Sequence, residues 1–163
     1  MAARIPLQLS VSATTREPRP GEQDGVDYHF LDDNEFAAKK AAGEFLETFE
    51  VFGRGYWYGT LRKEVESVLS QGKWVLLEID VNGMQQVSEK YPEAVSIFVR
   101  PDSLKELERR LRDRKTENEE TIQRRLEVAK HEWNFKDSYS FDVVNDRLDD
   151  TVERICNLLI EAE

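Results

Sequence analysis

The first third of the chain contains short stretches in which apolar and polar residues alternate, separated by turn-forming residues. Alternation with a period of two is typical of β-strands that place one face against a core. One segment between them, Asp33–Ala42, has the spacing of a short helix that Gly43 can end. We therefore predict a small, partly antiparallel sheet. Its strands are predicted at Leu7–Thr14, Asp27–Leu31, Phe45–Val51 and Tyr56–Thr60.

From Leu61 onward, amphipathic segments alternate with short, continuous apolar runs. Continuous apolar runs of this length predict strands that are buried on both faces, as in a parallel sheet. The predicted strands are Trp74–Ile79, Ala94–Val99 and Phe141–Val144, and the predicted helices are Leu61–Gln71, Gly83–Tyr91, the segment that begins with a capping box at Ser103 and Glu106, Glu119–Lys136 and Asp149–Ala162. This alternation indicates α/β architecture in one folding unit, with a small β-rich lobe inserted near the N-terminus.

Composition narrows the class of protein. The 163 residues are 39% hydrophobic and 34% charged, as in ordinary globular proteins, and no apolar run reaches the ~18 residues of a membrane span. The net charge of −10 argues against a nucleic-acid partner but allows a small anion to bind a local arginine cluster. The single cysteine, Cys156, is expected to pack in the interior. We expect a cytoplasmic protein that binds neither nucleic acid nor membranes.

The first group of residues that could carry chemistry is the segment SVSATTREPRPGEQDGVDYHF at residues 10–30. Arg16 and Arg19 leave a predicted strand and enter a loop that contains two prolines. Arginine guanidinium groups match phosphate oxygens in bidentate geometry, and a loop stiffened by proline loses less entropy on binding. The spacing therefore suits a phosphate site, although an ordinary solvated loop with two arginines accounts for it equally well.

The second group joins Glu47 to the glycine- and tyrosine-rich stretch GRGYWYGT at residues 53–60. A carboxylate facing such a turn could accept the N1 and exocyclic amine hydrogens of guanine, a donor pattern that adenine lacks. The alternative is an aromatic β-hairpin with a bulge, in which Thr60 is the N-cap of the next helix. Taken alone, the pattern favours this alternative.

Two further groups contain charged residues at the ends of predicted elements. Glu78 and Asp80 follow a buried strand, a usual place for ligand or magnesium contacts, although a helix N-cap fits as well. The arginines between residues 109 and 125 could stabilise a transferring phosphoryl group, but a solvated helix laced with glutamates fits their pattern better. His29 and His131 have no metal-ligand spacing and are expected on the surface.

These stretches stand in the order and spacing of guanylate kinases, which the chain resembles from about Leu7 to its C-terminus. The segment at residues 10–30 is the most specific. The resemblance implies a parallel-sheet nucleoside-kinase core, related to P-loop NTPases, in a single domain over residues 1–163. In it, a mixed-β GMP-binding lobe covers about residues 15–60, and the core at 61–163 carries a helical lid at about 110–130. The implied reaction moves the γ-phosphoryl of MgATP to GMP or dGMP.

The resemblance also assigns roles to residues at matching positions. Residues that match those holding the GMP phosphate are Ser12, Arg16, Arg19, Tyr28 and Tyr58. Glu47 and Thr60 match the guanine-reading residues, and Glu78 and Asp80 match acidic residues beside the ATP loop, so all four belong to the expected GMP site. Residues that match catalytic lid arginines are Arg110, Arg114 and Arg125. Asn145 matches an asparagine on the adenine side. No protein metal ligand is expected, and Mg²⁺ would accompany ATP.

Three departures from the family are minor. Asn82 stands where the family has Gln, and Lys115 stands where Gly is common, which would stiffen the lid hinge. The turn between Glu47 and Tyr58 is about two residues longer than usual in the family. The guanine lobe is therefore expected to differ locally from that of its relatives.

A larger departure is that the 163 residues contain no G-x-x-x-x-G-K-[ST] loop, which in the family holds the ATP phosphates. Either these residues are part of a longer kinase, which the intact arginine set favours, or the protein is a catalytically silent GMP-binding or protein-interaction module. The missing strand would lie between Trp74–Ile79 and Ala94–Val99. We expect those strands to close on each other, or the slot to be filled by a segment such as Ala3–Leu9 or by a second copy of the chain. A further possibility is that the chain is poorly stable without an upstream part.

Overall fold

A computed structural model describes residues 5–51, 55–114 and 118–162. The chain forms two compact units, residues 1–94 and 95–163, which are described separately. Both contain helices and strands, and the predicted α/β class is confirmed. The expectation of a single domain with a lobe at about residues 15–60 stays a prediction. In the described residues, no helix has the length and apolar character needed to cross a membrane.

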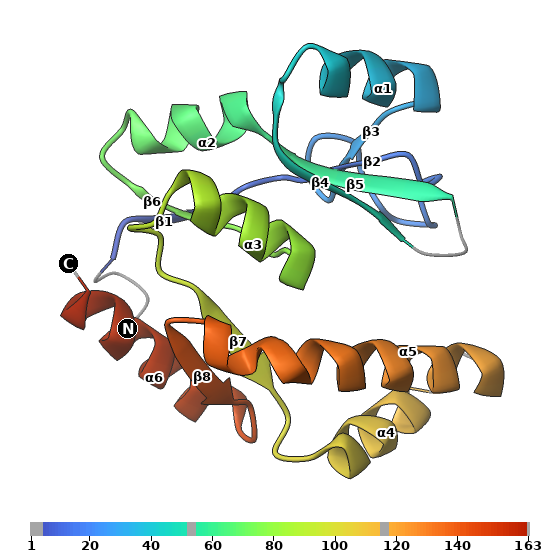
Figure 1. The fold of residues 1–163 in the computed structure, drawn as a ribbon, viewed down its shortest axis with the longest axis vertical. Coiled ribbons are helices and arrows are strands. Elements are labelled where there is room, and N and C mark those ends of the chain that lie inside the picture. Colours follow the sequence, from blue (N-terminus) through green and yellow to red (C-terminus); the bar gives the residue numbers. More distant parts are fainter. Residues whose placement is uncertain (1–4, 52–54, 115–117, 163) are drawn as a thin grey trace. The chain divides into compact units, whose positions relative to one another are not determined.

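The first unit contains a four-stranded mixed sheet in the order β3-β2-β5-β4 (Figure 1). Its strands are β2 (Ala13–Thr14), β3 (His29–Phe30), β4 (Phe45–Val51) and β5 (Tyr56–Leu61). The strand predicted at Leu7–Thr14 is divided, because β1 (Leu7–Leu9) pairs with a different sheet from β2. The predicted hairpin of β4 and β5 is confirmed, and its antiparallel pairing sets the position of the site described below.

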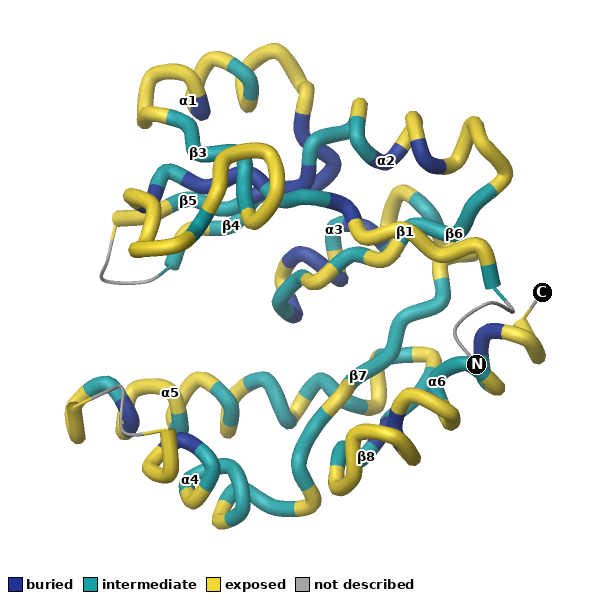
Figure 2. The backbone as a smooth tube through the Cα atoms, turned by 180° about the vertical axis from the view of Figure 1, so that it is seen from behind, coloured by how far each residue is buried: buried dark blue, intermediate teal, exposed yellow. Residues whose placement is uncertain are grey.

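Helix α1 (Asp33–Ala41) packs on this sheet through aromatic contacts. Asp32 and Glu35 form a capping box at its N-terminus, and Gly43 follows its C-terminus with a φ of 71°, a conformation that favours glycine. The Phe36 ring stacks on Phe45 with centroids 4.5 Å apart. Figure 2 shows that buried residues gather where this helix and the sheet meet. This cluster fixes the first half of β4.

Strand β4 departs from regular pairing close to its start. Phe45 pairs with Leu61 and Glu47 pairs with Thr60, so Leu46 is an extra residue opposite a continuous partner strand. An extra residue of this kind is a β-bulge, which bends the strand and redirects the side chains around it. Phe45, Leu46 and Glu47 are all buried. The bulge therefore allows an apolar pair and a carboxyl group to be buried side by side.

The rest of the first unit is a two-stranded parallel sheet with two helices. Strand β1 pairs with β6 (Trp74–Leu76), and helices α2 (Arg62–Leu69) and α3 (Val81–Lys90) follow β5 and β6. The prediction that the Trp74–Ile79 strand is buried on both faces is wrong, because Leu76 is 46% exposed. Within the described ranges only β1 pairs with β6.

The second unit contains a parallel pair of strands, β7 (Ile97–Arg100) and β8 (Phe141–Val144). Its helices are α4 (Leu104–Asp113), α5 (Glu119–Glu132), the 3₁₀ helix η1 (Trp133–Ser138) and α6 (Leu148–Glu161). The Arg100 guanidinium joins the strands through two 2.7 Å bonds to Asp142. Val99 is 47% exposed, so full burial of β7 was also predicted wrongly.

The second edges of β6 and β7 carry no partner strand in the part of the chain that the structure describes. The expectation that the strands Trp74–Ile79 and Ala94–Val99 close on each other stays a prediction, because β6 and β7 belong to different units. Part of the Ala3–Leu9 segment does pair with β6, as β1. The expectation that a further strand occupies the remaining edge of each stays a prediction.

Candidate functional site

Glu47 is the most deeply buried carboxyl group of the predicted site, with 3% of its surface exposed. Its Oε1 atom accepts a 2.7 Å hydrogen bond from the Thr60 hydroxyl on the paired strand. Its Oε2 atom is buried and has no hydrogen-bond partner in the described residues. Burial raises the pKa of Glu47, and the Thr60 bond only partly opposes this. Oε1 is therefore held in place by Thr60, while Oε2 can still accept a hydrogen bond.

The bond to Glu47 also settles the role of Thr60 in the hairpin. The N-cap of α2 is Leu61, which makes no capping hydrogen bond through its side chain. The alternative in which Thr60 caps this helix is therefore wrong. The pairing of Glu47 with Thr60 across β4 and β5 places both predicted base-reading residues together.

Asp80 lies close to the free oxygen of Glu47. It is the N-cap of α3 and accepts a 2.8 Å hydrogen bond from the Gly83 amide, so the capping alternative is correct for this residue. A Cβ atom placed on Gly83 would lie 3.0 Å from Glu47 Oε2 and 3.4 Å from Asp80 Oδ1. The two carboxyl groups thus face the same small region, and the charge of Asp80 further raises the pKa of Glu47.

Arg16 is buried and occupied by partners within the protein. Its Nη1 and Nη2 atoms donate to Glu22 at 3.0 and 2.9 Å, Nη1 also donates to the Glu17 carbonyl, and Nε donates to the Tyr58 hydroxyl at 3.2 Å. Glu22 accepts a further bond from the Arg19 amide. The Arg16 guanidinium, and then the Arg19 amide, lower the pKa of Glu22. Glu22 therefore holds the proline loop around a fixed cation.

Two aromatic residues complete this cationic end of the site. The Tyr28 and Tyr58 rings meet edge to face with centroids 5.8 Å apart, and the Arg16 guanidinium lies 5.4 Å from the Tyr28 ring centre. Burial and the charge of Tyr58 raise the pKa of Tyr28, and Glu78 adds a smaller effect in the same direction. Tyr28, Tyr58 and Arg16 are therefore brought together, as predicted, with Glu78 near enough to influence them.

The other two predicted phosphate-site residues are less constrained. Ser12 lies between β1 and β2, and its carbonyl accepts the His29 amide at 2.9 Å. The exposed Arg19 side chain has no hydrogen bond or ion pair with any described residue. Arg19 is thus a cation available to an incoming anion, beside the occupied Arg16.

The predicted catalytic arginines and Asn145 belong to the second unit. Arg110 donates to Glu106 at 2.7 Å and to the Asn145 carbonyl at 2.8 Å, so these two predicted site residues are in contact. The ion-pair alternative holds for Arg109, Arg110 and Arg112, which pair with glutamates on the helices. Arg109 and Arg110 lower the pKa of Glu106 to about 2. These contacts fix α4 against the end of β8.

The other two predicted lid arginines are Arg114 and Arg125. Arg114 is exposed at the C-cap of α4, and Arg125 lies in α5 and has interactions of its own. Lys115 and part of the longer turn, Phe52 to Arg54, lie outside the described residues. Cys156 is partly buried in α6.

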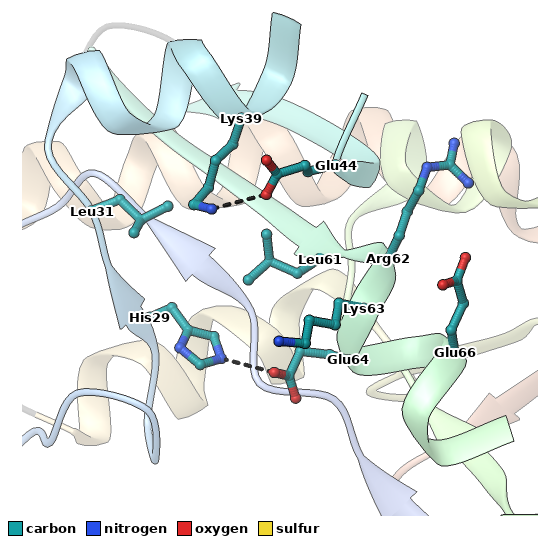
Figure 3. Close-up of a pocket in the computed structure, with 9 residues that line it drawn as sticks. All are labelled: His29, Leu31, Lys39, Glu44, Leu61, Arg62, Lys63, Glu64 and Glu66. Atoms are coloured by element: carbon teal, nitrogen blue, oxygen red, sulfur yellow. Dashed lines mark hydrogen bonds and ion pairs between the residues drawn. The ribbon is translucent and has the colours of Figure 1, made fainter. Parts of the chain in front are cut away.

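A hollow of about 500 Å³ lies on another part of the first unit (Figure 3). It is lined by Leu31, Leu61 and polar or charged residues around α1, β3 and the start of α2, and it includes none of the predicted site residues. His29 Nε2 lies 3.5 Å from Glu64 Oε1 at its rim. The described residues contain no group of three or more acids, histidines or cysteines that could hold a metal ion.

Sequence reasoning missed the residues that bind the predicted site residues or the strand that carries them. Glu22 was visible in the loop but was not recognised as the partner of Arg16. Gln86 and Lys90 bind the β4 backbone, and their contacts depend on which strand lies at the sheet edge. The spacing of Gly83, Gln86 and Lys90 on one helix face was the only available signal.

Comparison with known proteins agrees with this arrangement. The family model for guanylate kinase matches residues 4–162. The chain belongs to the guanylate kinase family. A guanylate kinase of Rhodopirellula baltica is 48% identical over 158 residues, which are 96% of this chain and 76% of the relative. One of Hahella chejuensis is 49% identical over 148 residues, or 91% of this chain and 70% of the relative.

A solved structure supports the fold as well as the family. The guanylate kinase of Anaplasma phagocytophilum superimposes with a TM-score of 0.80 at 37% identity, over 95% of this chain and 75% of that one. The guanylate kinase resemblance drawn from residues 10–30 is therefore confirmed at the level of family and fold.

Proposed function

We propose that the first unit binds the guanine nucleotide acceptor of a kinase that transfers the γ-phosphoryl of MgATP to GMP or dGMP. Family membership supports the general reaction class. The observation that carries the specific proposal is the buried, unpartnered Oε2 atom of Glu47. Buried polar atoms are nearly always hydrogen-bonded, so an orphaned carboxylate oxygen calls for a donor from a ligand.

Guanine supplies the donors that this carboxylate requires. Its N1–H and exocyclic amine lie on one edge and can approach the two oxygens of one carboxylate, whereas adenine has an acceptor at N1. Thr60 holds Oε1, while Oε2 has no hydrogen-bond partner among the described residues and can accept one from the base. A base that lacks the matching donor would leave this buried acceptor without a hydrogen bond, so the site should discriminate strongly against it.

The arginine and tyrosine end of the site suits the nucleotide phosphate. Arg16 is fixed by Glu22, and the side chain of Arg19 carries a positive charge without a partner in the described ranges. Tyr58 adds a hydroxyl group beside Arg16, and Tyr28 adds an aromatic ring against its guanidinium. A preorganised cation loses little entropy on binding, so this end would anchor the phosphate while Glu47 selects the base.

Phosphoryl transfer depends on positioning both nucleotides and neutralising charge, and the protein does little covalent chemistry. Arg110, Arg114 and Arg125 are the candidates for neutralising the transferring group, and Asn145 is the candidate contact for adenine. The 163 residues contain no glycine–lysine loop to hold the β- and γ-phosphates. We therefore propose that these residues bind GMP but do not turn over ATP unless such a loop is supplied.

Two measurements test the proposal. Calorimetry on the 163-residue chain should show GMP binding in preference to AMP, and equal affinities for the two would contradict the base-reading assignment. A coupled assay should detect no GMP-dependent ADP production from this chain. The same assay should detect turnover when the chain is preceded by a strand, a G-x-x-x-x-G-K-[ST] loop and a helix. Continued inactivity of that version would favour a silent binding module.

A further inference from the structure

One face of α3 lies against the bulged segment 46–48 of β4 and contacts it at three points. Gly83, Gln86 and Lys90 are spaced by three and four residues, so they form a single stripe along the helix. The segment they face has Glu47 at its centre. This stripe therefore supports the base-reading carboxylate from the side opposite its paired strand.

Two of the contacts are hydrogen bonds to the β4 backbone. The Lys90 ammonium donates to the Leu46 carbonyl at 2.5 Å. The Gln86 amide donates to the Thr48 carbonyl at 3.1 Å and accepts from the Thr48 amide at 3.4 Å. Strand β4 is at the edge of its sheet, so these backbone groups have no neighbouring strand among the described residues. Two helix side chains thus take over the bonds that a further strand would make.

The third contact is a close approach without a side chain. A Cβ atom on Gly83 would lie 3.0 Å from Glu47 Oε2 and 3.1 Å from Ile79 Cβ. A larger residue would therefore crowd the carboxyl group where it meets the helix. Side chains of α3 bind the backbone of the residues on both sides of Glu47, and the Glu47 carboxylate lies close to Gly83.

We propose that Gln86 and Lys90 are positioning residues that set guanine affinity by holding the bulge on which Glu47 stands; this rests on the proposed function of Glu47. The physical reason is that recognition through a buried carboxylate needs its oxygens placed to within about 0.5 Å. A bulged edge strand is held by its neighbours on one side only, so the helix supplies the missing constraint. Neither side chain touches the base.

The test replaces Gln86 with methionine, which has similar length and helix propensity but forms no such hydrogen bonds. Gln85→Met is the matched control, since Gln85 is the adjacent, exposed glutamine on the same helix. We expect Gln86→Met to bind GMP about five- to tenfold more weakly, the value of roughly one hydrogen bond, with unchanged affinity for inorganic phosphate. Gln85→Met should match the unaltered chain for both ligands.

Lys90 provides a second, independent variant. Lys90→Met should also weaken GMP binding selectively, and Lys90→Arg, which keeps a donor, should restore most of the affinity. Thermal unfolding of each variant verifies that it is folded, and Lys90 keeps the test decisive if Gln86→Met does not fold. A merely structural role would lower GMP and phosphate binding together, and this result would overturn the proposal.

The outcomes also separate this inference from the proposed function. If the unaltered chain shows no preference for GMP over AMP, the function assigned to Glu47 is wrong. If it prefers GMP but Gln86→Met and Lys90→Met bind GMP as tightly as the unaltered chain, the positioning role alone is wrong.

Discussion

Replacement of Glu47 by glutamine tests the proposed base-reading site with almost no change in size. The glutamine oxygen can still accept the Thr60 hydroxyl, but the second oxygen becomes an amide that donates rather than accepts. A hydrogen bond to a charged group contributes about 1.5–3 kcal/mol. Loss of one such bond and weakening of another should cost about 2–4 kcal/mol, or roughly 30- to 700-fold in GMP affinity.

Glu47→Gln should weaken GMP binding, but it should not destabilise the fold. Burial raises the pKa of Glu47 above its ordinary value of 4.5, so between the unfolded and folded pKa values the folded state binds more protons. Its contribution to stability is therefore present below the unfolded pKa and is lost as the pH rises through the folded pKa. Above the folded pKa the ionised, buried carboxylate lowers the stability of the protein, so Glu47→Gln should not lower the melting temperature at such a pH.

The raised pKa also predicts how GMP binding depends on pH. The ionised carboxylate accepts both guanine donors, so affinity should fall with acidification, starting above the range of an ordinary glutamate. This acid limb should be absent in Glu47→Gln. Any pH dependence from the phosphate itself remains in both proteins, so the comparison isolates Glu47.

The assay is calorimetry with GMP and inorganic phosphate over a range of pH, combined with thermal unfolding. Glu50→Gln is the matched control, because Glu50 is exposed on the same strand. If GMP and phosphate affinities fall together, or if Glu47→Gln melts several degrees lower than the control, Glu47 is a structural residue and the reasoning fails.

The phosphate end and the packing of the hairpin each give one further prediction. Arg16→Ala should weaken the binding of both GMP and inorganic phosphate by about 1.5–3 kcal/mol. It should also lower the melting temperature, because it leaves Glu22 without its partner. Unchanged phosphate affinity in calorimetry would contradict this. Gly59→Ala should lower the free energy of unfolding by about 1–3 kcal/mol, because a Cβ there would lie 2.9 Å from the Glu47 carbonyl oxygen. If urea unfolding shows a loss below about 0.5 kcal/mol, β4 shifts to accommodate the added methyl group at little cost.

Local sequence determined several elements closely. The predicted strands Phe45–Val51 and Phe141–Val144 have the observed bounds. Helix α1 ends one residue before the predicted position, just ahead of Gly43, whose φ of 71° is what glycine favours. The motif at residues 10–30 is specific enough to indicate the family by itself, and the family model confirms it.

Other features depended on residues far away in the sequence. The chain from Leu7 to Thr14 reads as one strand, yet its two ends pair with different sheets. Leu76 and Val99 read as fully buried but are half exposed, because burial depends on whether another segment covers a strand. A hydrophobic pattern records what a side chain prefers and cannot record whether a neighbour is present.

The same division applies to the candidate site. The sequence pointed to Arg16, Tyr28 and Glu47, because phosphate and guanine demand particular chemical groups, and the family resemblance added Thr60 and Tyr58. Only the tertiary structure decided that Glu47 keeps one oxygen without a partner, that Glu22 occupies Arg16, and that α3 holds the bulged strand. These are facts about distances between segments 6 to 44 residues apart. Residue type limits the bonds that a side chain can form, and folding selects which of those bonds are made.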